Sequence, residues 1–91
     1  MRPVRLHRRA QAYMRRMPPS RRKQVADTLK EVAALPDVGT HPRVQPLAGQ
    51  YEGWYRLRVG IYRAIFVVLE ISEDPGEELF VDYVGPRGDA Y

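Results

Sequence analysis

The second half of the chain contains three segments with strand patterns separated by short turns, and this order limits the possible folds more than any other feature. Trp54–Val59 alternates between two faces, Tyr62–Glu70 is apolar enough to be a central strand, and Glu78–Val84 forms the last strand. Gly60 lies in the first turn, and Ser72–Glu77 forms the second. Because short turns join neighbouring antiparallel strands, we expect these segments to pair in sequence order in one sheet.

The first third of the chain combines a short strand with two helices. Pro3–His7 alternates apolar and basic residues, and the apolar period then becomes helical. The Pro18–Pro19 pair ends the first helix, and the second ends near Leu35–Pro36. Either Ser20 caps the second helix or Pro19 occupies its first turn. The expected buried faces consist of Ala10, Tyr13, Met14, Met17, Val25, Leu29, Val32 and Ala33.

Residues 36–53, between the helices and the strands, contain three prolines and three glycines. We expect an extended loop there, anchored to the core by Leu47. The predicted order is therefore β-α-α-β-β-β, an α+β domain in which a helical hairpin packs on one face of a small, mostly antiparallel, four-stranded sheet. We expect this domain to span residues 1–91 and to leave its other sheet face open for function.

The composition excludes several classes of protein. The chain has no cysteine, so disulfides, thiol catalysis and cysteine-ligated zinc are excluded. The longest apolar run, Ala64–Leu69, is too short to span a bilayer, and we expect a cytoplasmic protein without membrane partners. His7 and His41 lie outside the arginine-bearing segments, so a nuclease with paired catalytic histidines is poorly supported. No metal-ligand cluster is visible, and we expect neither a metal nor a cofactor.

Charge is divided unevenly along the chain. Residues 1–30 contain ten Arg or Lys and one acid, whereas residues 31–91 contain five basic and ten acidic residues. An N-terminal transit peptide is one explanation, but serine is scarce and the segment supplies apolar core positions. We favour a basic helical layer that makes non-specific contacts with the phosphates of a polyanion, with a solvated helix face as the alternative. The residues concerned are Arg8, Arg9, Arg15, Arg16, Arg21, Arg22 and Lys23.

Four of the five basic residues in the acidic part lie in or beside predicted strands: Arg56, Arg58, Arg63 and Arg87. Arg56 and Arg58 point to the same side of one strand, and Arg63 enters the next strand just past the turn. A guanidinium is permanently charged, and its rigid fork of donors fits a phosphate. We therefore expect the four to converge on one edge of the sheet as a site for a phosphodiester, most simply that of a nucleic acid.

The competing explanation is an ordinary set of surface arginines. They would then be solvated, or paired with the carboxylates of Glu52, Glu70 and Asp82. Four arginines together in an acid-rich region argue against it, because such a cluster repels itself unless an anion or carboxylates compensate its charge.

The aromatic residues divide between the core and the candidate site. We expect Tyr62 and Tyr83 in the core. Tyr91 is placed to stack on a base, although frayed ends are the ordinary state of a terminus. Trp54 is either a residue at the rim of the core or a second stacking platform.

The residues from Trp54 to Phe66, WYRLRVGIYRAIF, strongly resemble the core motif of the RelE/ParE toxin superfamily, whose members commonly read YRLRVGxYRxIY after a βαα beginning. The ending Val84–Tyr91, VGPRGDAY, is similar to the xGHRxxxY tail of the RelE branch. The strand at Val4–Leu6, the arginine-rich first helix and the Leu47–Gly49 element also fit. The resemblance covers nearly the whole chain.

The resemblance implies a toxin of a bacterial type II toxin–antitoxin pair, a metal-independent endoribonuclease that cuts mRNA in the ribosomal A site and inhibits translation. By position, Arg56 and Arg58 line the cleft, Arg63 stabilises the phosphate, Arg87 lies next to the leaving group, and Tyr91 stacks on the nucleotide. The implied partners are a cognate antitoxin and the ribosome with its mRNA. Operator DNA is expected to be bound only through the antitoxin complex.

Departures from the family pattern leave other functions open. Some members have lysines where Arg56 and Arg58 stand, and arginine is a poor base because its guanidinium stays protonated. Either Tyr91 is the base, or the ribosome and electrostatics do most of the work. Pro86 also replaces a residue that is often polar or basic in the family tail. The alternatives are a ParE-like inhibitor of DNA gyrase without nuclease activity, and an inactive module that only binds its antitoxin.

Overall fold

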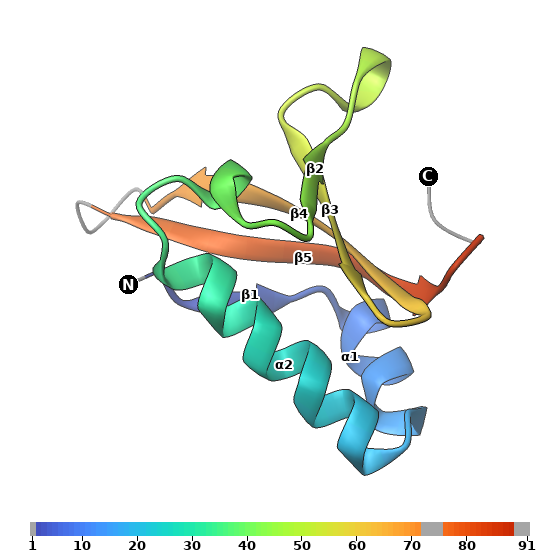
Figure 1. Ribbon diagram of the computed structural model, residues 1–91. Helices are drawn as coiled ribbons and strands as arrows, with labels where there is room; N and C mark the ends of the chain where they lie inside the picture. Colours follow the sequence, from blue (N-terminus) through green and yellow to red (C-terminus); the bar gives the residue numbers. More distant parts are fainter. Residues whose placement is uncertain (1, 72–75, 89–91) are drawn as a thin grey trace.

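The computed structural model describes residues 2–71 and 76–88, in which two helices lie on one side of a sheet (Figure 1). In chain order the elements are β1 (Val4–Leu6), α1 (Arg8–Arg16), α2 (Pro19–Ala34), β2 (Val44–Pro46), β3 (Trp54–Val59), β4 (Tyr62–Glu70) and β5 (Glu77–Pro86). Short 3-10 turns precede and follow β2 at Val38–Thr40 and Gly49–Tyr51. The sheet order is β1-β5-β4-β3-β2, with β1 parallel to β5 and the other neighbours antiparallel. The predicted α+β class and the sequential pairing of β3, β4 and β5 are confirmed.

The expectation of four strands is wrong, because the structure adds β2 at the edge of the sheet. Its three residues pair antiparallel with β3, with Val44 opposite Leu57. The segment is too short to show an alternating pattern, and it ends in Pro46, which lacks a backbone N–H and is tolerated at an edge. Leu47 is not the core anchor either. It stays half-buried, whereas Val38 and Val44 are 4% and 7% exposed.

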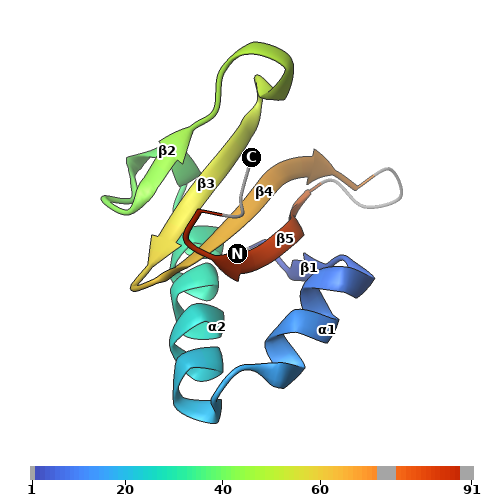
Figure 2. The ribbon, with the colours of Figure 1, turned by 90° about the vertical axis from the view of Figure 1, so that its right-hand side faces the viewer.

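Both helices pack against the same face of the sheet (Figure 2). Their predicted apolar faces are confirmed, since Tyr13 is partly buried and the other seven expected residues are fully buried. Across the core these side chains meet Leu57, Val59, Ala64, Phe66, Leu79, Val81 and Val84 of the strands. Helix α2 has Pro19 in its first turn and no side-chain cap, so the proline alternative is the one observed. No helix in the described part of the chain is long and apolar enough to cross a membrane.

Acidic residues of β5 pair with arginines of the N-terminal segment. The ion pairs are Arg2–Glu77 at 2.9 Å, Arg5–Glu78 at 2.6 Å and Arg9–Asp82 at 2.6 Å. The hydrogen bond from Arg5 holds the pKa of the Glu78 carboxyl below its ordinary value. These contacts connect β1 and α1 to β5.

Candidate anion-binding site

The sheet brings Arg56, Arg58, Arg63 and Arg87 together on the side that the helices leave open. Arg58 lies directly opposite Arg63 in the β3–β4 ladder. Directly opposed residues point to the same side of a sheet, and Arg56 shares that side because it is two residues from Arg58. Beyond β5, the backbone N–H of Arg87 donates to the carbonyl of Ile61 at 2.6 Å, which holds Arg87 beside the β3–β4 turn. We call these four residues the arginine cluster.

Arg63 is the centre of the arginine cluster in electrostatic terms. Partial burial of its guanidinium, and then the positive charges of Arg56, Arg58 and Arg87, lower the pKa of Arg63 from its ordinary value. Its Nε atom is buried and has no hydrogen-bond partner in the part of the chain that the structure describes. Both the unpaired donor and the repulsion among like charges cost free energy. The fold therefore holds Arg63 in a state that a bound anion would stabilise.

Carboxylates do not neutralise the arginine cluster within the described ranges 2–71 and 76–88. Asp82 pairs with Arg9, and neither Glu52 nor Glu70 forms an ion pair with the cluster. Arg56 instead donates to the side-chain oxygen of Gln45, a neutral acceptor that leaves the net charge unchanged. Of the two ordinary explanations for strand arginines, pairing with carboxylates is thus not observed among these residues.

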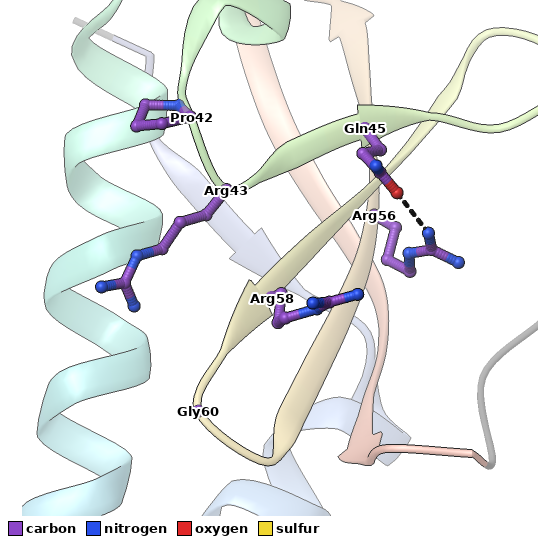
Figure 3. A pocket seen from close by; sticks show the side chains of 6 residues that line it. All are labelled: Pro42, Arg43, Gln45, Arg56, Arg58 and Gly60. Atoms are coloured by element: carbon purple, nitrogen blue, oxygen red, sulfur yellow. Dashed lines mark hydrogen bonds between the residues drawn. The ribbon is translucent and has the colours of Figure 1, made fainter.

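A hollow of about 320 Å³ opens beside the arginine cluster at the β2 edge of the sheet (Figure 3). Its lining consists of Pro42, Arg43, Gln45, Arg56, Arg58 and Gly60. Arg43 is not among the predicted site residues, because it precedes β2 in the proline-rich loop and lies outside every predicted strand. Its residue type could have identified it, since Arg43 is the one basic residue of the acidic segment 31–91 besides the four of the arginine cluster.

Tyr83 lies on the arginine-bearing face, so its predicted place in the core is wrong. It is opposite Ile65, and its ring covers Gly85, where an added Cβ would lie 2.1 Å from the phenolic oxygen. Gly85 is in turn opposite Arg63, so the phenol borders the arginine cluster. The prediction for Tyr62 is confirmed, because its side chain is partly buried and packs against the core.

The position of Tyr83 follows from a bulge in β5. Ile65 is opposite Tyr83, but the next residue, Phe66, is opposite Val81, so Asp82 is an extra residue in the ladder. One extra residue shifts the alternation of every side chain that follows it. Without the bulge, Tyr83 would point to the same face as Val81 and join the core.

The basic helical residues that were predicted to contact phosphates lie in the helical layer, on the other side of the sheet from the arginine cluster. Arg9 and Lys23 pair with acidic neighbours, each at 2.6 Å. The others lie on the surfaces of the helices, and they are Arg8, Arg15, Arg16, Arg21 and Arg22.

Trp54 lies on the arginine-bearing face, two residues before Arg56, and Tyr91 lies outside the described residues. The described residues include no group of His, Asp and Glu that could hold a metal ion.

No family model and no curated protein matches the sequence. Solved structures do match over nearly the whole chain. A YoeB/ParE toxin from Agrobacterium tumefaciens has 13% identity and a TM-score of 0.74, with 93% of this chain and 98% of that chain covered. The archaeal RelE–RelB complex from Pyrococcus horikoshii OT3 has 20% identity and a TM-score of 0.71, with 98% of each chain covered. The toxin–antitoxin complex RelBE2 from Mycobacterium tuberculosis has 20% identity and a TM-score of 0.59, with 94% and 98% covered. The chain therefore has the fold of the RelE/ParE toxins.

Proposed function

We propose that this chain is the toxin of a type II toxin–antitoxin pair and that it cuts mRNA in the ribosomal A site. The arginine cluster carries this proposal, because the Nε of Arg63 has no partner among residues 2–71 and 76–88 and three further guanidiniums surround it on the sheet face opposite the helices. The fold shared with RelE and YoeB/ParE toxins supports the same assignment. Concentrated positive charge that pairs with no carboxylate of the described residues is suited to a reaction in which negative charge grows on a phosphate.

The proposed reaction is an internal transfer at one phosphodiester. The ribose 2′-oxygen loses its proton and bonds to the adjacent phosphorus, while the bond from phosphorus to the 5′-oxygen of the next nucleotide breaks. That oxygen takes up a proton, so the products are a 2′,3′-cyclic phosphate and a 5′-hydroxyl. Charge on the non-bridging oxygens is greatest in the pentacoordinate phosphorane. Preorganised cations therefore stabilise the transition state more than the substrate.

The residues of the arginine cluster have different roles in this proposal. Arg63 binds the non-bridging oxygens, Arg87 lies next to the leaving oxygen, and Arg56 and Arg58 line the cleft and fix the geometry for in-line attack. None of them is the base, because a guanidinium stays protonated. Tyr91, which we propose to stack on the nucleotide, or a group of the ribosome takes the proton. The helical arginines would contact ribosomal phosphates.

The proposed protein partner is a cognate antitoxin. Two of the similar structures are toxin–antitoxin complexes, RelBE2 and RelE–RelB. An acidic antitoxin segment laid over the arginine cluster would supply the anions that the described residues do not, and the neutralised complex would be inactive. Operator DNA would be bound only through that complex.

Inhibition of DNA gyrase, without nuclease chemistry, is the second candidate function. The Agrobacterium structure, with a TM-score of 0.74, bears the ParE name as well as the YoeB name. A gyrase inhibitor would arrest growth and leave mRNA intact, so RNA cleavage separates the two functions.

Replacing Arg63 by Ala tests the proposed function. We expect single-turnover cleavage of mRNA on programmed ribosomes to slow by ~10²–10³-fold, the usual effect of losing one preorganised charge-stabilising group. The melting temperature should not fall, because the substitution removes a repelled charge and an unpaired donor. Arg5→Ala is the matched control, since Arg5 is a strand arginine already paired with Glu78, and it should cleave at the wild-type rate.

Cleavage by the Arg63→Ala protein at the wild-type rate would place the chemistry elsewhere in the molecule. If the wild-type protein leaves the mRNA intact under the same conditions, the nuclease proposal fails and a supercoiling assay with gyrase tests the second candidate.

A further inference from the structure

We propose that Arg43 and the hollow beside it form a second phosphate-binding subsite, which takes a phosphate of the same single-stranded RNA upstream or downstream of the one held at Arg63. This inference rests on the proposed function, because it extends that site along the RNA. It goes beyond the arginine cluster, since it assigns binding to a residue that lies on the loop before β2.

The backbone fixes Arg43 next to the arginine cluster. Its carbonyl accepts the backbone N–H of Arg58 at 3.0 Å, and its own N–H donates to Nδ1 of His41 at 3.1 Å. Arg43 is therefore the neighbour of Arg58 across the edge of the sheet. Its side chain takes part in neither contact and is exposed.

The direction of the Arg43 side chain argues for a separate phosphate. In Figure 3 the guanidinium of Arg43 extends toward α2, whereas those of Arg56 and Arg58 extend in the opposite direction, with the hollow between them. Arg43 and Arg63 flank Arg58 on its two sides, two strand spacings or ~10 Å apart at the backbone. Because the Arg43 guanidinium extends away from those of Arg56 and Arg58, we infer that it meets a different phosphate from the one held at Arg63. A chain that leaves Arg63, passes Arg58 and continues over the hollow would meet Arg43 next.

The lining of the hollow has the chemistry of an anion site. Among the described residues it combines three arginines with Gln45 and includes no acidic residue. The side-chain oxygen of Gln45 accepts a hydrogen bond from Arg56, so its amide nitrogen is left to donate to a ligand. Gly60 adds no side chain at the turn. Arg43 forms no ion pair in the part of the chain that the structure describes.

The arginine cluster, the hollow and Arg43 together form a basic surface whose width fits several nucleotides better than one. From the β2 edge to Gly85 on β5 the surface crosses three strand spacings, which is ~14 Å. The hollow of about 320 Å³ is comparable with sites of ~300–1,000 Å³ that hold small organic ligands. One phosphodiester occupies only the centre of this surface, so a longer strand is needed to fill it.

Binding of uncleavable RNA to Arg43→Gln tests the subsite. The probes are a 2′-O-methyl dinucleotide with one phosphodiester and a 2′-O-methyl hexanucleotide, and the measurement is the dissociation constant at several salt concentrations. We expect Arg43→Gln to weaken hexanucleotide binding and to reduce the slope of log K against log salt by ~0.7, the loss of one phosphate contact on a single strand. Dinucleotide binding should be unchanged. Arg5→Gln is the control and should match the wild type for both probes.

The possible failures are distinguishable. If the wild type binds the hexanucleotide and Arg43→Gln binds it with the same affinity and salt slope, the second subsite is refuted and the proposed function stands. If the wild type binds neither probe, while ribosome-programmed mRNA is also left intact, the phosphate site itself is refuted. An equal loss of dinucleotide and hexanucleotide binding would mean that Arg43 belongs to the central site, which also overturns the proposal.

Discussion

At the scale of single residues, the decisive feature is a guanidinium surrounded by like charges. Arg63 has a pKa lowered by partial burial and by three other arginines, and its Nε has no partner in the described residues. A lysine in that place would present a point charge, whereas the planar guanidinium presents a fork that matches two phosphate oxygens. Because arginine does not release its proton, the site is suited to stabilising charge and not to abstracting a proton.

Gly85 is a residue whose replacement should disturb the site without removing an arginine. A Cβ at Gly85 would lie 2.1 Å from the hydroxyl oxygen and 2.5 Å from Cζ of Tyr83, so the phenol must move. We expect Gly85→Ala to cost ~1–3 kcal/mol of unfolding free energy through overpacking. The cleavage rate should fall by ~10–100-fold, because Arg63 lies opposite Gly85 and a displaced Tyr83 ring would no longer hold its guanidinium in place.

The matched control is Gly76→Ala, since an added Cβ at Gly76 meets no atom within 4 Å. Denaturant unfolding and single-turnover cleavage measure the two effects. Equal stability and equal rates for the two alanine variants would show that Tyr83 and Gly85 are not coupled to the site.

At the scale of elements, the sequence was sufficient to predict a helix or strand wherever the apolar pattern extended over several residues. The two helices, β3, β4 and β5 have long enough apolar periods to be predicted, and the sequential pairing of the strands then places Arg58 opposite Arg63. The errors come from local events without a pattern. A three-residue edge strand has no detectable period, and the bulge at Asp82 is a property of the ladder that reverses the side on which Tyr83 lies. Arg43 escaped prediction because its position depends on that unrecognised edge strand.

The contact between the helical layer and the sheet should dominate the stability of the fold. Leu29 of α2 is 1% exposed and lies in the core, whereas Ile61, in the turn between β3 and β4, is 64% exposed. We expect Leu29→Ala to cost ~2–5 kcal/mol, because it removes buried apolar contacts and leaves a cavity. Ile61→Ala should change the unfolding free energy by less than ~0.5 kcal/mol. Urea denaturation measures both, and similar losses for the two variants would contradict the observed core.

At the scale of the whole molecule, folding sorts charge in a way that the linear sequence conceals. Residues 31–91 are acidic overall, yet three of their acids on β5 pair with arginines of the N-terminal segment. The arginines of β3 and β4 are left without carboxylate partners in the described ranges. The open face therefore carries concentrated positive charge, although it belongs to the acidic part of the chain. Such a surface should bind polyanions with a strong dependence on salt.

The central claim is that this face cuts translated mRNA, and primer extension on mRNA from cells that briefly express the chain tests it most directly. The comparison is with Arg87→Ala, which removes a side chain of the arginine cluster but keeps the backbone bond from Arg87 to Ile61. We expect cuts within codons of translated mRNA for the wild type and none for the variant. Intact mRNA in cells whose growth is arrested by the wild-type protein would contradict the claim and favour the gyrase function.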